Sequence, residues 1–143
     1  MIVVDANVCL YAHDSTSSHH ATARAWLSAV LNGGEPVRFP WTTILAFLRL
    51  TTSPRVFDRP LSVTEASDAV GTWLSAPAGG TVEASERHWT VLRDLLHEAA
   101  ATGPLVADAH LAALAIEHGA TLATTDRDFR RFPGLRLLDP TAA

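Results

Sequence analysis

The chain has 143 residues, which is enough for one domain with a buried core. Hydrophobic residues make up 48% of it and charged residues 18%, and no apolar run approaches the roughly 20 residues that cross a bilayer. The net charge of −4 argues against a protein that holds nucleic acid through bulk positive charge. All eleven basic residues are arginines, so a phosphate-binding loop with its lysine and Schiff-base chemistry are both excluded.

The first residues do not resemble a signal peptide, because Asp5 interrupts the apolar start and no basic region precedes it. The single cysteine, Cys9, has no partner for a disulfide within the chain and lies in an apolar run that predicts a buried side chain. We therefore expect a soluble cytoplasmic protein. The charged fraction is below the usual value, which is consistent with a surface partly covered by another chain.

Strand-like and helix-like segments alternate along the chain. The expected strands are 2–4, 37–39, 81–83, 121–124 and 136–138. The expected helices are 7–12, 23–31, 41–51, 62–75, 89–99 and a helix that has Asp108 in its first turn and ends at Gly119. This alternation predicts an α/β fold with a mostly parallel sheet and helices on both faces. We expect one domain, 1–143, with 140–143 as a loose tail.

Two of the expected helices carry distinctive signals. Ser62 and Glu65 match a capping box, which predicts a helix start at that point. The helix 41–51 is apolar on most sides, which predicts that it is largely buried, and it contains Arg49. A buried arginine needs an acidic or phosphate partner. Arg49 is therefore either part of a structural salt bridge or a residue that orients acidic groups or a substrate.

Three aspartates occupy corresponding places at the edge of the expected sheet. Asp5 follows the first strand, Asp126 follows the strand 121–124, and Asp108 lies in the first turn of a helix. Each of them alone has a bland interpretation as a cap, a turn residue or a dipole partner. Together they indicate convergence at the edge where open α/β sheets bind ligands. Carboxylates this close repel one another unless a cation lies between them, and Mg²⁺ or Mn²⁺ is the natural choice.

The histidines give no comparable pattern. His110, two residues after Asp108, is expected on another side of that helix, as packing or surface. No role is assigned to three further histidines, His88, His97 and His118. The four tryptophans are interpreted as core or interface residues. Two arginine groups fit solvated surface and phosphate contact equally well, namely Arg49, Arg55 and Arg59, and Arg127, Arg130 and Arg131.

Four segments in order along nearly the whole chain resemble a PIN-domain ribonuclease of the VapC toxin type. They are Val4–Val8, Thr43–Arg49 with Thr52–Arg55, Val106–Ala112, and Thr124–Phe129. The resemblance implies a single-domain three-layer α/β/α sandwich, Mg²⁺-dependent endonucleolytic cleavage of RNA, and a homodimer. It also implies a type II toxin–antitoxin pair in which a cognate antitoxin covers the active site.

The resemblance also implies roles for particular residues. Asp5, Asp108 and Asp126 match the family's acidic positions, which bind metal and activate a water for attack on a phosphodiester. Asn7 and Thr125 match polar residues that line the same pocket. Asp128 is an auxiliary acid in the same turn.

One position departs from the family pattern. The family commonly has a glutamate where this chain has Ala46, so the metal loses one ligand or outer-sphere acceptor. A catalytically weakened domain that binds or regulates is therefore the alternative function. An aspartate-nucleophile phosphatase of the haloacid-dehalogenase type is disfavoured, because that chemistry usually needs a second aspartate where Asn7 stands and a lysine.

Overall fold

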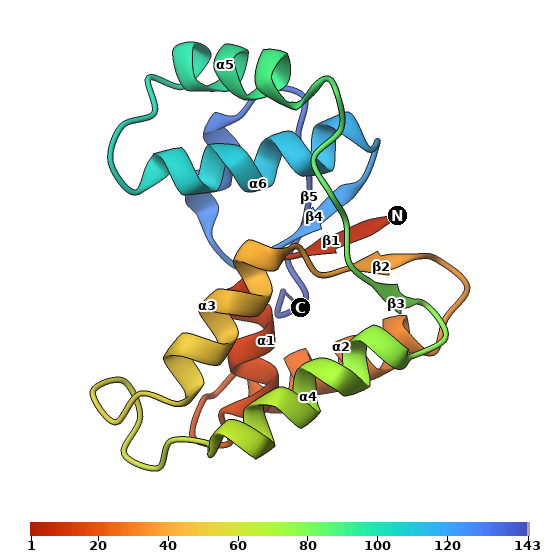
Figure 1. Ribbon diagram of the computed structural model, residues 1–143, viewed down its shortest axis with the longest axis vertical. Coiled ribbons are helices and arrows are strands. Elements are labelled where there is room, and N and C mark those ends of the chain that lie inside the picture. Colours follow the sequence, from red (N-terminus) through yellow and green to blue (C-terminus); the bar gives the residue numbers. More distant parts are fainter. Residues whose placement is uncertain (143) are drawn as a thin grey trace.

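The computed structural model describes residues 1–142, which fold into three layers (Figure 1). The middle layer is a five-stranded sheet with the order β3-β2-β1-β4-β5, and every neighbouring pair is parallel. Its strands are β1 (Ile2–Val4), β2 (Val37–Arg38), β3 (Gly79–Gly80), β4 (Thr121–Ala123) and β5 (Arg136–Leu138). The predicted α/β class with a parallel sheet is thereby confirmed.

Helices cover both faces of this sheet. Figure 1 shows α5 and α6 on one side, and α1 to α4 on the other. The helices are α1 (Ala6–His13), α2 (His20–Leu31), α3 (Trp41–Thr51), α4 (Val63–Ser75), α5 (His88–Glu98) and α6 (Leu105–Glu117). A short 3₁₀ helix, η1 (Arg127–Arg131), follows β4. The expected helices therefore all form, with ends that shift by a few residues.

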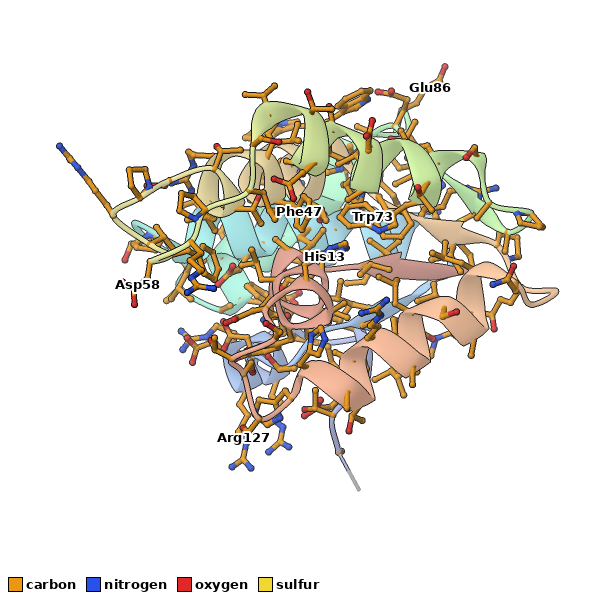
Figure 2. All side chains as sticks on the ribbon, turned by 90° about the horizontal axis from the view of Figure 1, so that it is seen from below. His13, Phe47, Asp58, Trp73, Glu86 and Arg127 are labelled. Carbon is orange, nitrogen blue, oxygen red and sulfur yellow. The ribbon has the colours of Figure 1, made fainter. Side chains whose placement is uncertain are left out.

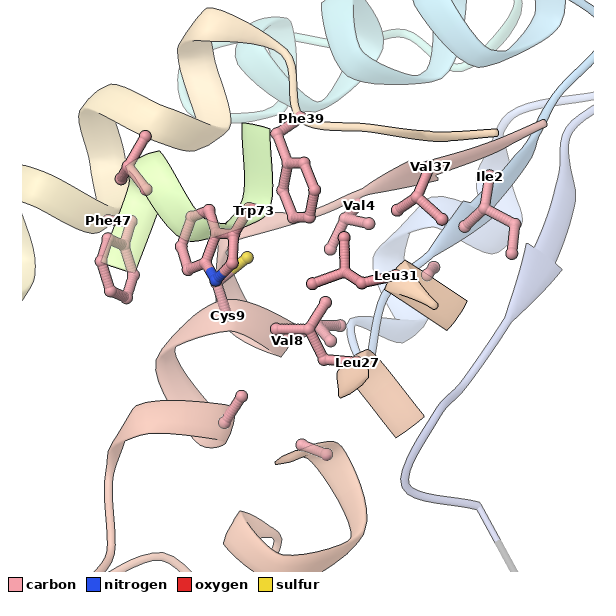
Figure 3. Packing of buried hydrophobic residues seen from close by; sticks show 14 of the residues in the cluster. Ile2, Val4, Val8, Cys9, Leu27, Leu31, Val37, Phe39, Phe47 and Trp73 are labelled. Atoms are coloured by element: carbon pink, nitrogen blue, oxygen red, sulfur yellow. The ribbon is translucent and has the colours of Figure 1, made fainter. Parts of the chain in front are cut away.

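The central strand divides its side chains between two cores. Successive side chains of a strand point to opposite faces, so Ile2 and Val4 pack with α1 to α4, whereas Val3 packs with α5 and α6. In the first core, Trp73 stacks on Phe39 at a centroid distance of 4.9 Å. Figure 3 shows this group of buried residues. Both faces of β1 are therefore buried, and only the carboxyl end of this strand can contribute residues to a binding site.

The expected signals at two helix ends are present. The Ser62 hydroxyl accepts from the Glu65 N–H at 3.0 Å, and the Glu65 carboxylate accepts from the Ser62 N–H at 3.0 Å. This reciprocal pair confirms the capping box. Gly119 follows α6 with φ +64°, a left-handed conformation that glycine adopts without strain.

The prediction of a third strand at 81–83 is wrong, because the strand lies at Gly79–Gly80. A Cβ atom at Gly79 would lie 1.8 Å from the carbonyl oxygen of Trp73. Only glycine allows β3 to approach the end of α4 so closely while it pairs with Val37 of β2. Gly79 and Gly80 follow α4 and could be taken for residues that only end this helix, but they form the strand β3 themselves.

The prediction that α3 is largely buried, with Arg49 inside, is also wrong. Only one side of α3 is buried, through Thr43, Ile44, Phe47 and Thr51. Leu45 is 60% exposed, and Arg49 is exposed as well. The reason is positional, since α3 contacts α1 and α4 and leaves its outer side uncovered in the single chain.

One of the four tryptophans, which the sequence places in the core or at an interface, is exposed on α5 in the single chain. Trp89 is 64% exposed, and Leu95 is the buried residue of this helix. The expected loose tail is only partly described. Pro140 is buried, the Thr141 N–H donates to the Asp139 carboxylate at 2.9 Å, and Ala143 lies outside the described residues. Among residues 1–142, no helix has the length and apolarity needed to cross a membrane.

Candidate active site at the carboxyl edge of the sheet

Asp5 is fixed at the junction between β1 and α1. It is the N-cap of α1, and its Oδ1 accepts from the Ala6 N–H at 2.7 Å. Its Oδ2 accepts from the hydroxyl of Thr124 at 2.8 Å. Because β1 and β4 pair in register, Asp5 and Thr124 lie side by side just past the two strand ends. This carboxylate is therefore oriented by both central strands.

Asparagine often caps a helix, but the cap of α1 is Asp5, and Asn7 lies inside the first turn of this helix. Its amide Nδ2 donates to Thr124 Oγ1 at 3.3 Å, and its Oδ1 accepts from the Thr125 N–H at 3.4 Å. Asn7 thus ties the first turn of α1 to the exit of β4. Thr125 contributes its backbone to this contact, beside the carboxylate of Asp5.

Thr124 connects the polar groups of this edge, although sequence reasoning gave it no individual role. Its hydroxyl donates to Asp5, and it accepts from the Asn7 amide and from the Asp126 N–H at 3.1 Å. Thr124 is buried, and all three contacts are satisfied at once. The one available sequence signal was its place directly after a strand, where the motif Thr124–Phe129 begins.

Asp126 and Asp128 lie in the turn that follows β4. Asp126 is the N-cap of η1, and its Oδ1 accepts from the Asp128 N–H at 2.9 Å. Asp128 is exposed, and its carboxylate lies 3.8 Å from the guanidinium of Arg131. The two acids of this turn therefore differ, since Asp126 is partly buried beside Thr124 whereas Asp128 faces solvent.

Asp108 enters the same electrostatic environment from the first turn of α6. Partial burial and, to a smaller extent, the carboxylates of Asp126, Asp5 and Asp128 together raise its pKa to about 6, while Arg131 opposes them. Burial also raises the pKa of Asp5, and Asp126 adds to that rise against the hydrogen bonds from Thr124 and Ala6. The structure therefore brings together the three acids that were singled out in the sequence. We call Asp5, Asp108 and Asp126 the acidic edge.

The chemistry of the acidic edge suits a hard divalent cation. Within residues 1–142, no three His, Cys, Asp or Glu side chains stand close enough to contact one ion together. Mg²⁺ does not require such a cage, because it usually keeps several waters and binds one or two carboxylates. Burial is the main cause of the raised pKa values of Asp5 and Asp108, and the charge of Asp126 adds to both, so a cation bound here would relieve a real repulsion.

Three residues of α3 were either singled out in the sequence or lie near the acidic edge, namely Thr43, Ala46 and Arg49. The Thr43 hydroxyl donates to the Val4 carbonyl at 2.8 Å, directly before Asp5, which places this turn of α3 beside the acidic edge. Ala46 is three residues after Thr43, so the two residues lie on the same side of α3. Arg49 is exposed and takes part in no ion pair found within residues 1–142.

Two surface hollows lie elsewhere on the molecule. One, of about 480 Å³, lies between α1 and the loop before α4, and the other, of about 610 Å³, lies between α2 and α4. His13 lines both, and Figure 2 shows it near Phe47 and Trp73. None of the three acids lines either of these two hollows.

A second polar cluster lies between α5 and α6, and sequence reasoning missed it. The side chain of Glu117 is 0% exposed, and its Oε2 lies 2.7 Å from His88 Nδ1. His88 Nε2 lies 2.9 Å from His110 Nδ1, and the Ser85 N–H donates to Glu117 Oε1 at 2.7 Å. We call His88, His110 and Glu117 the histidine cluster. From the sequence, His88 has no role and His110 is expected in packing or at the surface, and no local pattern could reveal contacts that join positions 22 and 29 residues apart.

Comparison with known proteins agrees with this geometry. The family model described as PIN domain matches residues 2–135. Ribonuclease VapC37 of Mycobacterium tuberculosis is 44% identical over 142 residues, which cover 99% of each protein. Ribonuclease VapC43 of the same species is 41% identical over 98% of this chain and 95% of its own.

Solved structures show the same fold. VapBC-1 from nontypeable Haemophilus influenzae superposes with a TM-score of 0.70 at 16% identity, over 99% of this chain and 100% of that one. VapC20 of Mycobacterium tuberculosis, described as a sarcin-ricin loop cleaving toxin, gives a TM-score of 0.66 at 17% identity, over 95% and 99% of the two chains. Together with the family match and the relatives of 41 to 44% identity, these findings show that the chain belongs to the PIN-domain family, among its VapC-type ribonucleases.

Proposed function

We propose that the chain is a metal-dependent endoribonuclease that acts as the toxin of a type II toxin–antitoxin pair in the cytoplasm. One observation carries this proposal: three carboxylates, from the end of β1, from α6 and from the turn after β4, lie close enough at one edge of the sheet for Asp5 and Asp126 to add to the raised pKa of Asp108. Asp5 and Asp126 also cap α1 and η1, but capping does not explain why Asp108 lies beside them, since their repulsion costs stability in the absence of a cation. The name ribonuclease, printed for relatives 41 to 44% identical, agrees with the proposal.

Asp5, Asp108 and Asp126 would hold the metal, one or two of them directly and the rest through water on the ion; we take it to be Mg²⁺, with Mn²⁺ as a substitute. Bound there, the ion would supply Lewis acidity to the phosphate and lower the pKa of water. PIN-domain ribonucleases of this type generally depend on divalent metal, in agreement with this donor set. Thr124 and the Ala6 N–H orient the Asp5 carboxylate through their hydrogen bonds, so that it stays in place before any ligand arrives.

Asp126 is the candidate for moving a proton. Its Oδ1 accepts from the Asp128 N–H, which leaves Oδ2 to take a proton from the attacking water. Asn7 and Thr125 line the same place and keep the exit of β4 in position. Attack of water in line with the leaving 3′-oxygen yields a 5′-phosphate and a 3′-hydroxyl without a covalent intermediate.

RNA binding needs positive charge close to these acids, because the whole chain is acidic, with a net charge of −4. The exposed arginines of η1, directly after Asp126, provide it. Figure 2 shows Arg127 at the outer surface of the molecule. Arginine suits this role because its planar fork binds phosphate in a bidentate manner.

A cognate antitoxin would cover the acidic edge, and the active form would be a homodimer. Several solved neighbours are described as VapBC complexes, among them one from Salmonella typhimurium bound to DNA. Two large apolar side chains of α3, Trp41 and Leu45, are exposed in the single chain, which supports cover by another protein surface. Light scattering on the purified chain tests the dimer, and a monomer at working concentration would refute it.

The decisive experiment is cleavage of total cellular RNA by the purified chain, freed of any partner, with Mg²⁺, Mn²⁺ or chelator. Asp108→Asn is the test variant, and Asp94→Asn, an exposed acid on α5, is the matched control. Discrete fragments that require metal and vanish only in Asp108→Asn would support the proposal. Cleavage that persists in Asp108→Asn would place the active site elsewhere.

Because Ala46 replaces the family's glutamate, a second function also needs a test, namely a domain that binds metal and RNA without cleaving the RNA. Intact RNA in the same experiment, with metal binding measured separately by calorimetry, would favour that alternative. The phosphatase alternative gains no support from the structure, because the Asn7 amide is already engaged by Thr124 and Thr125.

A further inference from the structure

The histidine cluster is the largest polar arrangement that the proposed ribonuclease function does not use. It joins His88, the first residue of α5, to His110 in the middle of α6 and to Glu117 near the end of α6. The side chain of His88 is 15% exposed, and His110 is half-buried, so solvent can reach the space beside the two rings. The acidic edge does not contribute to it, since the charged groups that act on His110 are His88 and Glu117.

The hydrogen bonds fix the tautomers of the two rings. The Glu117 carboxylate also accepts from the Ser85 N–H, so the 2.7 Å contact requires His88 to donate from Nδ1. In the neutral form of His88, Nε2 is the acceptor, and His110 then donates from Nδ1 across the 2.9 Å contact. One proton therefore lies between His88 Nε2 and His110 Nδ1. His88 Nε2 has a lone pair in this tautomer, and His110 Nδ1 has one in the other tautomer of its ring.

We propose that His88 Nε2 and His110 Nδ1 form a binding site for a transition-metal ion of the zinc, nickel or copper class, with Glu117 as the carboxylate that orients His88. Solvent completes the coordination sphere. The proton on His110 Nδ1 moves to Nε2 of the same ring, so His110 stays neutral and no other reactant is needed. This site is separate from the acidic edge and does not depend on the proposed ribonuclease function.

Metal binding requires the two rings to part and to turn. Two imidazole nitrogens bound to one tetrahedral Zn²⁺ at about 2.0–2.1 Å each lie about 3.3 Å apart. The observed separation is 2.9 Å, so the rings need to part by about 0.4 Å. Each ring also has to rotate, because nitrogens that share a hydrogen bond point at each other, whereas two ligand nitrogens point at an ion beside the line that joins them. The terminal torsion of a histidine side chain is soft, and the half-buried ring of His110 supplies this movement.

The contact to Glu117 is the second feature that points to a metal. A metal-binding histidine usually donates its other ring nitrogen to a carboxylate, which fixes the tautomer and makes the ligand more basic. His88 already has this arrangement in the described chain, with a carboxylate that is 0% exposed. Imidazole ligands also distinguish this site from the acidic edge, because Mg²⁺ prefers oxygen donors and zinc, nickel and copper accept nitrogen.

The test is a Zn²⁺ titration of the untagged full chain, followed by NMR of the histidine ring nitrogens with excess Mg²⁺ present to occupy the acidic edge. We expect the ring signals of His88 and His110 to shift together while the other histidines do not. Cu²⁺ bound to the same protein should show an electron paramagnetic resonance spectrum with coupling to nitrogen, which oxygen donors cannot give.

Two variants and a control make the outcome decisive. His110→Gln leaves the contact between His88 and Glu117 in place and should abolish the Zn²⁺ response, whereas His97→Gln, an exposed position on α5, should keep it. Glu117→Gln should weaken Zn²⁺ binding roughly tenfold or more. No shift at His88 and His110, or an unchanged response in a folded His110→Gln protein, would overturn the proposal whether or not the chain cleaves RNA.

Discussion

Helix α6 carries two carboxylates with opposite surroundings. Asp108 in its first turn is near other carboxylates, which raise its pKa together with partial burial. Glu117 at its other end is fully buried, yet it accepts hydrogen bonds from the Ser85 N–H and from His88. Burial alone therefore does not identify a functional acid. The informative difference is whether the chain itself supplies the compensating donors.

Mutation of Asp108 in the acidic edge and of Glu117 in the histidine cluster should therefore have different effects on stability and function. The acidic edge has a deficit of positive charge, which a cation from solution can correct. Glu117 already has its donors, so it stabilises the start of α5 against α6 without any ligand. Loss of Asp108 should accordingly harm function and spare stability, and loss of Glu117 should do the reverse.

The largest expected effect is on catalysis by Asp108→Asn. We expect RNA cleavage to fall by roughly 100-fold or more, because a metal-binding carboxylate is lost from the site. Initial cleavage rates on one RNA at saturating Mg²⁺ measure it. The fold should persist, since the change removes a repulsive charge, and a protein that unfolds at ambient temperature would contradict the assignment of Asp108 to function.

The matching change at the other end of α6 is Glu117→Gln. We expect the free energy of unfolding to fall by about 1–3 kcal/mol, because buried donors lose their charged acceptor. Urea unfolding measures this fall, with Glu98→Gln, an exposed glutamate of α5, as the control. Cleavage per folded molecule should stay unchanged, and an equal loss in both variants would remove the contrast between the sites.

A glutamate at position 46, as the family commonly has, should strengthen metal binding at the acidic edge. In Ala46→Glu we expect the Mg²⁺ concentration for half-maximal cleavage to fall by a factor of roughly five to ten, because one more oxygen donor faces the ion. A Mg²⁺ titration of the cleavage rate measures the shift, with Ala46→Gln as the uncharged control. No shift would mean that position 46 lies too far from the ion to influence it.

The pH dependence of stability should differ between wild type and Asp108→Asn. The pKa of Asp108 is raised from 3.8 to about 6, so between these values the folded state holds more protons than the unfolded state. Without metal, this group therefore makes the wild type less stable as pH rises through that window. Asp108→Asn should match the wild type near pH 4 and be more stable at pH 7, and added Mg²⁺ should reduce the gap.

The smallest expected effect concerns the arginines of η1. Arg127→Gln should weaken RNA binding by a factor of a few, and it should lower the slope of log Kd against log salt by about 0.7 if one phosphate contact to a single strand is lost. Fluorescence anisotropy at several salt concentrations, with Mg²⁺ replaced by Ca²⁺, measures both. Arg93→Gln on α5 should change neither, and equal effects of the two variants would point to general charge only.

Much of this architecture follows from local sequence. The β-branched start, the capping box at Ser62 and the glycine at 119 depend on neighbours in the chain, so they could be predicted and were found. The grouping of Asp5, Asp108 and Asp126 followed from the rule that parallel strands end at one edge. Their catalytic and metal-binding roles stay predictions.

Other features depend on contacts that no local pattern reports. The exposure of Arg49 and Trp89 was missed because hydrophobic periodicity finds an apolar helix face but not the neighbour that covers it. The strand at Gly79–Gly80 was missed because its reason is the approach of Trp73. Pairing of His88 with Glu117 needs α5 to fold back on α6, which only the tertiary structure shows.

The contact between Thr124 and Asp5 has a consequence for synthesis of the protein. These two residues are 119 positions apart, and β1 obtains its partner β4 only after most of the chain has been made. Until then Asp5 lacks the hydroxyl that orients it, and Asp126 does not yet exist. Folding during translation proceeds from the N-terminus, so a chain that has been made only as far as α5 has neither β4 nor two of the three proposed metal-site residues, Asp108 and Asp126. If the proposed function is correct, such an incomplete chain cannot cleave the RNA that encodes it.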